Sequence, residues 1–261
     1  MNKAVQYPAP FVTALLICSS MLSVAADPAV AAGCFFRPQG EGRVAAVVDA
    51  RSFRLDDGRE VNLAGVEPAD RAKGAAALSA LLAGRDVDLR GDDDTPDRYG
   101  RQPAFVFLTG SEIPVQAELL RQGIALVSAD VIDKDCAAVL ASAEADARKA
   151  KQGAWADPTV IKNAESSGDI LSGIGRFAVV EGKVLSVRQA GATTYLNFGR
   201  NWTRDFAATI SRRMMGTFEA AGFSPKSLEN KRIRVRGVIE ARGGPRIEVF
   251  RVGQIDVLGG T

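Results

Sequence analysis

The sequence DRYGR (residues 97–101) is followed after a short interval by LLRQGIALV (residues 119–127). Between them lies QPAFVFL (residues 102–108), whose run of apolar and aromatic side chains predicts a buried strand. A helix is predicted to begin at Pro114 and to end at Gly123, because proline is common at the first helical position and glycine is common just past the last. The first half of the chain is therefore expected to combine a β-sheet with helices.

Further strands and helices are expected on both sides of this unit. Apolar runs and an Asp57-Gly58 turn predict the strands. Apolar residues at helical spacing, each series followed by a glycine, predict the helices. The expected strands are 43–50, the hairpin 51–66 and 85–90, and the expected helices are 69–83 and 135–152.

The second half predicts three strands, a helix and two more strands, which is the element order of an OB barrel. We therefore expect a mainly β fold with α (α+β), built as two tandem OB-like five-stranded barrels, the first with added helices. A polar stretch with glycine and serine, residues 163–175, looks like part of a linker. The expected domains are a signal peptide (1–32), a first domain (34–157), a linker (158–175) and a basic OB-like domain (176–261).

The N-terminus has the features of a secretory signal peptide. Lys3 supplies the positive end, residues 11–24 form an apolar run, and small residues follow. Cleavage fits after Ala26 or after Ala32, and lipid attachment at Cys34 is an alternative. The apolar run is shorter than the roughly 20 residues that span a bilayer, so no membrane span is expected in the mature chain. We expect export to the periplasm or the extracellular space.

Cysteine and histidine content limits the chemistry available to the chain. Once the leader with Cys18 is removed, Cys34 and Cys136 remain. In an exported chain these two favour a single disulfide, and two unrelated thiols are the alternative. The chain has no histidine, which excludes Ser-His and Cys-His catalytic dyads and zinc sites with histidine ligands.

Charge is divided unevenly along the sequence. Residues 34–157 carry 16 Lys and Arg against 21 Asp and Glu, a net charge of −5. Residues 158–261 carry 16 against 9, a net charge of +7. Because a basic domain attracts polyanions, the second half is the better candidate for electrostatic contact with nucleic acid.

The first half resembles the staphylococcal nuclease (thermonuclease, SNase-like) family over about residues 42–155. The motifs that carry the resemblance are DARS (49–52), NLAGVEPAD (62–70), DRYGR (97–101), LRQGIA (120–125) and GAW (153–155). The resemblance implies an OB-type barrel and, in active members, calcium-dependent endonuclease activity on DNA or RNA. In those members carboxylates hold the calcium, two arginines bind the phosphate oxygens, and a glutamate orients the attacking water.

Some positions of that family site are filled in this chain and others are not. By the resemblance, Arg101 matches the second arginine, Asp70 matches the glutamate, and Glu67 matches a metal-binding aspartate. Arg51 replaces the other metal-binding aspartate, and Asn62 replaces the first arginine. Because arginine has no lone pair for a cation, the resemblance implies a degenerate site with no cofactor, or with calcium if the chain is an active nuclease. Arg51 either binds phosphate in place of the metal or forms an ion pair with Glu67.

The basic half contains a second candidate site. The stretch YLNFGRNWTRDF (195–206) interleaves aromatic residues with arginines, as single-strand-binding surfaces do. The arginines of RIRVR (232–236) alternate, so they would leave one face of a strand as a basic stripe. The alternative is that the phenylalanines are core residues and the arginines form a solvated outer face. The candidate nucleic-acid-binding residues are Trp202, Arg200, Arg204, Arg232, Arg234 and Arg236.

Three functions remain open from the sequence, and with them the question of whether the chain is an enzyme. A protein that binds nucleic acid or an envelope partner without efficient catalysis fits the departures at Arg51 and Asn62. An active nuclease would clamp phosphate with Arg51 and Arg101 and use Asp70 or Glu67 as the base. A structural interaction protein would use its opposed charges to bind a protein partner or a second copy.

Overall fold

The computed structural model describes residue 1 and residues 36–259. Apart from Met1, the predicted leader lies outside the described residues, and so does Cys34. Export and the disulfide between Cys34 and Cys136 therefore stay predictions. None of the helices in the described part is both long and apolar enough to cross a membrane.

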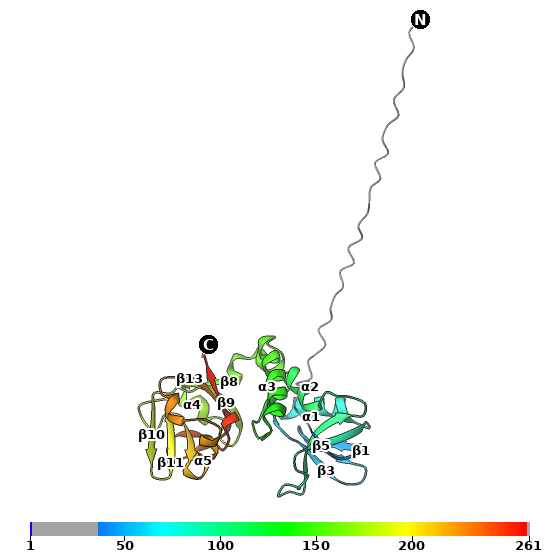
Figure 1. Ribbon diagram of the computed structural model, residues 1–261, viewed down its shortest axis with the longest axis horizontal. Coiled ribbons are helices and arrows are strands. Elements are labelled where there is room, and N and C mark those ends of the chain that lie inside the picture. Colours follow the sequence, from blue (N-terminus) through cyan, green and yellow to red (C-terminus); the bar gives the residue numbers. More distant parts are fainter. Residues whose placement is uncertain (2–35, 260–261) are drawn as a thin grey trace. The chain divides into compact units, whose positions relative to one another are not determined.

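The first half is built around a closed barrel of five strands, in the order β1-β2-β3-β6-β5 (Figure 1). The first residues of β1 pair with β5 and its last residues pair with β2, and a parallel pairing of β3 with β6 completes the ring. Phe53, Leu55, Leu89 and Phe107 are buried in its core. The strands are β1 (Arg37–Val47), β2 (Ser52–Leu55), β3 (Glu60–Leu63), β5 (Asp86–Gly91) and β6 (Gln102–Leu108). The predicted first barrel is confirmed.

Helices and a short strand pair accompany this barrel. The strand pair β4–β7 is antiparallel and places Glu67 opposite Leu126. Asp70 and Asp133 begin α1 and α3, because each carboxylate accepts a hydrogen bond from a backbone N–H of the first turn. The elements are β4 (Val66–Pro68), α1 (Arg71–Leu82), α2 (Val115–Arg121), β7 (Ala125–Val127), α3 (Lys134–Lys149) and 3-10 helices at Gly153–Ala156 and Pro158–Val160.

The segments that follow α2 and α3 meet backbone to backbone. Gly123 and Gly153 both have a positive φ, 64° and 55°. A Cβ atom on Gly123 would lie 2.1 Å from the carbonyl oxygen of Gln152, so only glycine fits there. The backbone N–H of Ala154 donates to the carbonyl of Gly123 at 2.9 Å. Gly123, just past α2, and Gly153, at the start of the first 3-10 helix, therefore join the segments that follow α2 and α3.

The second half forms a larger sheet. Its order is β10-β11-β12-β14-β13-β9-β8, and β15 pairs with β13. The strands are β8 (Ile161–Asn163), β9 (Phe177–Lys183), β10 (Ser186–Ala190), β11 (Thr193–Asn197), β12 (Ala207–Ser211), β13 (Arg232–Ala241), β14 (Pro245–Glu248) and β15 (Ile255–Leu258). The helices are α4 (Ser167–Leu171), α5 (Arg212–Ala220) and 3-10 turns at Pro225–Leu228 and Val252–Gln254.

The prediction of a closed five-stranded second barrel is wrong, because the described residues form an eight-stranded sheet that is not closed. The strand pairing is interrupted at Val184 and Leu185, between β9 and β10. Val184 exchanges backbone hydrogen bonds with the 230–231 segment before β13, whereas Leu185 donates to the carbonyl of Asn197 on β11. The segment from β9 to β10 is thus divided between two partners, because β9 pairs with β13 and β10 pairs with β11. β8 and β15 add further strands to the sheet.

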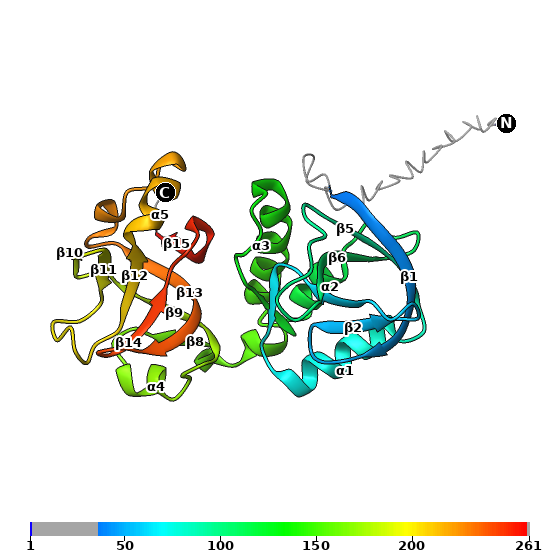
Figure 2. The same ribbon diagram turned by 90° about the horizontal axis from the view of Figure 1, so that it is seen from below.

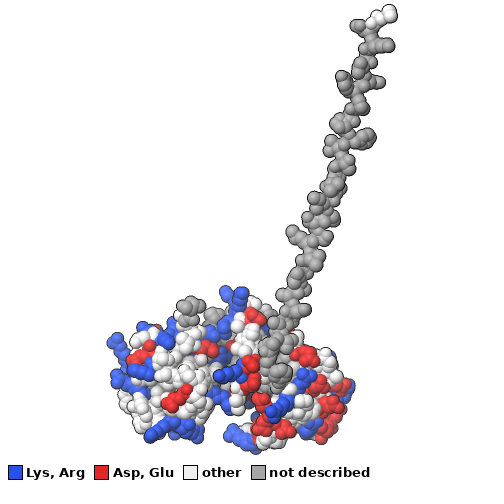
Figure 3. Space-filling model, in the orientation of Figure 1, with Lys and Arg blue, Asp and Glu red and all other residues white. Residues whose placement is uncertain are grey.

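The segment predicted as a linker, residues 158–175, contains β8 and α4. β8 pairs in parallel with β9, and Ile170 of α4 is buried in the second core. This segment therefore contributes to the second sheet. Figure 2 shows α3 on the side of the barrel that faces β13 and β15. On the face drawn in Figure 3, acidic side chains gather over the barrel, whereas Lys and Arg are spread over the second half.

Candidate functional site

A depression of about 690 Å³ lies beside the barrel where the family resemblance places its active site. The β1–β2 turn, β4, α1 and the residue before β6 contribute its walls. Its lining residues are Asp49, Ala50, Arg51, Glu67, Pro68, Arg71, Ala72, Ala75 and Arg101. The structure therefore brings Arg51, Glu67 and Arg101 together, as the sequence predicted.

Arg51 and Glu67 form an ion pair in this depression. The Arg51 guanidinium donates to the Glu67 carboxylate and, at 3.3 Å, to the carbonyl oxygen of Val66. The backbone N–H of Arg51 donates to Asp49 Oδ1 at 2.9 Å, which fixes the turn that carries it. Burial raises the pKa of the Glu67 carboxyl, and the charge of Arg51 opposes that rise. Of the two readings of Arg51 from the sequence, the geometry matches the ion pair.

Arg101 is held by neighbours rather than free in the depression. Its Nε and Nη2 donate to Asp97 Oδ2 at 3.0 and 2.8 Å, and its Nη1 donates to Ser52 Oγ at 3.4 Å. The hydrogen bond to Arg101 lowers the pKa of Asp97. Ser52 also donates to Asn62 Oδ1 at 3.3 Å, so Asn62 lies behind Arg101 without lining the depression. Arg101 is thereby oriented, with its side chain 18% exposed.

Asp70, the predicted counterpart of the family glutamate, is placed differently. Its carboxylate accepts from the backbone N–H of Lys73 at 2.8 Å and caps α1. It lines a neighbouring depression together with Phe177 and Val238 rather than the one that holds Arg101. The geometry therefore gives Asp70 a structural role at the helix start.

Arg71 lines the depression and was missed by the sequence reasoning. It is the first residue of α1, is exposed, and has no ion-pair partner within the described part of the chain. The signal that could have found it is its place directly after the helix-capping Asp70. A residue there starts the helix that forms one wall of the depression.

The donor groups do not fit a calcium ion. Calcium takes six to eight oxygen ligands, mostly from carboxylates and carbonyls. The carboxylates that line the depression are Asp49 and Glu67, and both accept hydrogen bonds from Arg51. Within the described residues there is no group of three or more His, Cys, Asp or Glu that could hold a metal ion.

The candidate residues of the second half fall into two groups. Trp202, Arg200 and Arg204 are exposed, Trp202 to 78%. Phe198 and Phe206 are buried with their ring centres 5.1 Å apart, so the interpretation of these phenylalanines as core residues is confirmed.

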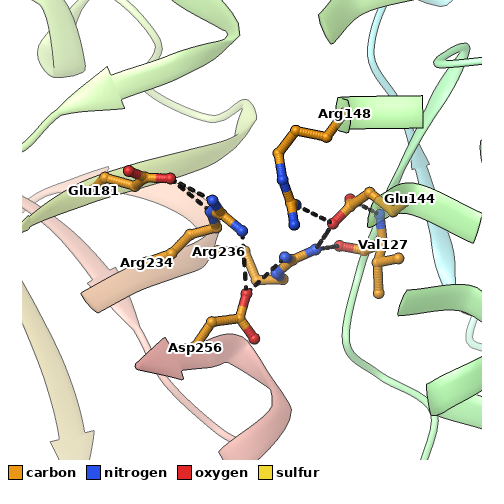
Figure 4. Close-up of polar contacts among 7 residues, drawn as sticks. All are labelled: Val127, Glu144, Arg148, Glu181, Arg234, Arg236 and Asp256. Carbon is orange, nitrogen blue, oxygen red and sulfur yellow. Dashed lines mark hydrogen bonds and ion pairs between the residues drawn. The ribbon is translucent and has the colours of Figure 1, made fainter. Parts of the chain in front are cut away.

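Arg234 and Arg236 do not form an exposed basic stripe with Arg232. Their side chains are only 9% and 5% exposed, whereas that of Arg232 is 64% exposed. Figure 4 shows the reason, because the two buried guanidinium groups lie among carboxylates from both halves of the chain. The partners of Arg234 are Glu181 and Asp256, and those of Arg236 are Glu144, Asp256 and the carbonyl of Val127.

Comparison with known proteins agrees with the family resemblance of the first half. Residues 69–157 match the family model described as Staphylococcal nuclease homologue. The matched range begins directly after β4 and includes α1, α2, α3 and the first 3-10 helix. A search of curated proteins finds no match. The match and the closed five-stranded barrel agree with the resemblance read from the motifs. This chain therefore contains a staphylococcal nuclease-like domain, to which residues 69–157 belong.

Proposed function

We propose that the chain binds nucleic acid through its SNase-like domain without metal-dependent hydrolysis. The observation that carries this proposal is the ion pair between Arg51 and Glu67. A guanidinium has no lone pair to offer a cation, and its own charge repels one. Since Glu67 is already neutralised by Arg51, the carboxylate charge that a hard cation requires is used within the protein.

The same depression suits a phosphate group. Three of its lining residues are arginines and two are carboxylates. Asp97 and Ser52 hold Arg101 in one orientation, whereas Arg71 is exposed and forms no ion pair among the described residues. Arginine suits phosphate because its planar guanidinium donates two parallel hydrogen bonds. Arg71 would supply the contact, and Arg101 would present further donors beside it.

A titration of labelled single-stranded oligonucleotide with the full chain tests this proposal. Phosphate binding releases counterions, so the observed binding constant should fall steeply with salt. Arg71→Ala should weaken binding and reduce the salt slope by about one. Arg85→Ala, which removes an exposed arginine that does not line the depression, is the matched control. Equal effects of the two substitutions would show that only general charge matters and would overturn the assignment of the site.

A further inference from the structure

A second depression, of about 610 Å³, lies on the face formed by β10 and β11. Ser186 pairs with Asn197 and Arg188 pairs with Tyr195 across the two strands. Because side chains alternate along a strand, these four residues share one face. The intervening Leu196 is buried in the second core. We call this depression the β10–β11 pocket, lined by Leu185, Ser186, Arg188, Ala190, Tyr195, Asn197, Gly199, Arg200 and Trp202.

One wall of the β10–β11 pocket is a loop that is fixed at its base. The backbone N–H of Asn201 donates to Asp205 Oδ2 at 2.8 Å, and Asn201 Oδ1 accepts from the N–H and hydroxyl of Thr203. Gly199 leaves no room for a side chain, since a Cβ there would lie 2.0 Å from a carboxylate oxygen of Asp205. These hydrogen bonds hold the loop in one conformation, in which Trp202 is exposed to solvent.

The chemistry of the pocket specifies a flat, anionic ligand. Two of its lining residues, Trp202 and Tyr195, are aromatic, and two, Arg188 and Arg200, are cationic. No carboxylate lines it, and neither arginine has an ion-pair partner in the part of the chain that the structure describes. Ser186 and Asn197, joined by a 3.3 Å hydrogen bond, add polar groups to its floor.

We propose that the β10–β11 pocket binds single-stranded nucleic acid, with bases stacked on Trp202 and Tyr195 and phosphates contacted by Arg188 and Arg200. This proposal rests on the proposed function, because both name nucleic acid as the ligand, and it adds a second binding site for that ligand. Aromatic side chains stack on bases that a single strand leaves open, whereas a duplex keeps its bases inside. Uncompensated arginines supply the phosphate contacts that such sites combine with stacking.

The experiment compares binding of a labelled oligothymidine strand and a duplex of the same length to the full chain, by anisotropy and by tryptophan fluorescence. Trp155 is buried and Trp202 is 78% exposed, so quenching reports on Trp202. The single strand should bind more tightly and quench. Trp202→Ala should weaken single-strand binding about tenfold and abolish the quenching.

Two variants serve as controls for this experiment. Trp202→Phe keeps a stacking ring and should restore most of the affinity. Arg200→Ala should weaken binding more than Arg213→Ala, which removes an exposed arginine outside the pocket. Because Trp202 and Arg200 are exposed, these substitutions should leave the circular dichroism spectrum unchanged.

Three results would overturn the proposal: wild-type affinity in Trp202→Ala, equal binding of duplex and single strand, or no quenching with either nucleic acid. The last would favour a protein ligand for the pocket. The test also separates this proposal from the proposed function. If Arg71→Ala weakens binding and Trp202→Ala does not, the β10–β11 pocket is excluded and the SNase-like site stands. The reverse result excludes the SNase-like site and supports the pocket.

Discussion

Arg236 of β13 donates from Nη1 to both carboxylate oxygens of Glu144 of α3, at 3.1 and 3.0 Å. Both side chains are buried, and they come from opposite halves of the sequence. The second guanidinium nitrogen of Arg236 donates to Asp256 at 3.0 Å, and Glu144 also accepts from the backbone of Val127. The contact therefore ties the second sheet to the SNase-like domain by charge, and it adds to a small apolar cluster in which Leu126, Ala147 and Trp155 pack with Val179 of β9.

Removing Arg236 should destabilise the whole chain. Arg236→Met leaves Glu144 with Arg148 at 3.7 Å as its remaining ion-pair partner. Loss of one partner from a buried pair costs about 3–5 kcal/mol, which urea unfolding would measure as a lower midpoint. Arg232→Met, on the same strand but exposed, is the control and should change the free energy of unfolding by less than about 0.5 kcal/mol. Equal costs at the two positions would contradict a special role for the buried pair.

The contact between Gly123 and Gly153 predicts a second large effect on stability. Gly123→Ala should cost the left-handed strain of about 1–2 kcal/mol and a further cost for the clash with the Gln152 carbonyl. Gly110→Ala is the matched control, because Gly110 also has a positive φ but has nothing within 4 Å of its added Cβ. In thermal unfolding, the melting temperature of Gly123→Ala should be well below that of Gly110→Ala. Equal melting temperatures would mean that the two backbones can separate without cost.

The raised pKa of Glu67 predicts a pH dependence of stability. Below its ordinary pKa of 4.5, Glu67 is protonated in the folded and in the unfolded chain. As the pH rises above 4.5, Glu67 ionises in the unfolded chain before it ionises in the folded chain. The folded form therefore loses stability as pH rises through the raised pKa. Glu67→Gln should flatten this decline, and Arg51→Met should steepen it, because the opposing charge is removed. Urea unfolding over a pH series measures both slopes, and identical slopes in all three proteins would refute the effect.

Restoring a carboxylate at residue 51 should change metal affinity. Arg51→Asp removes the guanidinium and places a third carboxylate beside Asp49 and Glu67. Because calcium affinity follows the count of charged oxygen ligands, the variant should bind Ca²⁺ at least about tenfold more tightly than the wild-type chain. Isothermal titration calorimetry makes the comparison. Unchanged affinity would show that Arg51 is not what prevents binding.

Local features of the fold followed from the sequence because their causes are local. Asp57-Gly58 and Gly84 follow β2 and α1 closely, as turn geometry requires, whereas α3 ends at Lys149, before the predicted stop at Gly153. The motif DRYGR, which carried part of the family resemblance, forms a turn whose first and last residues pair, Asp97 with Arg101. The encounter of Arg51 with Glu67 also followed, since the family motifs place both at one site.

Other features depended on contacts between distant segments. Arg234 and Arg236 alternate as predicted, but their carboxylate partners are separated from them by 53 and 92 residues, so their burial was not visible in the pattern. The interruption at Val184 and Leu185 follows Glu181-Gly182-Lys183, and it depends on backbone partners in residues 230–231 and in β11 that lie far along the chain. Arg71 joined the site only through the position of α1 against the β1–β2 turn.

Cleavage of labelled single-stranded DNA by the full chain is the most direct measurement, with Ca²⁺, with Mg²⁺ and with chelator in parallel. Because Arg51 neutralises Glu67, we predict no metal-dependent cleavage, with binding of the DNA unchanged by chelator. Cleavage that requires Ca²⁺ or Mg²⁺ and disappears in Arg101→Ala would contradict this and identify the chain as an active nuclease with unusual ligands.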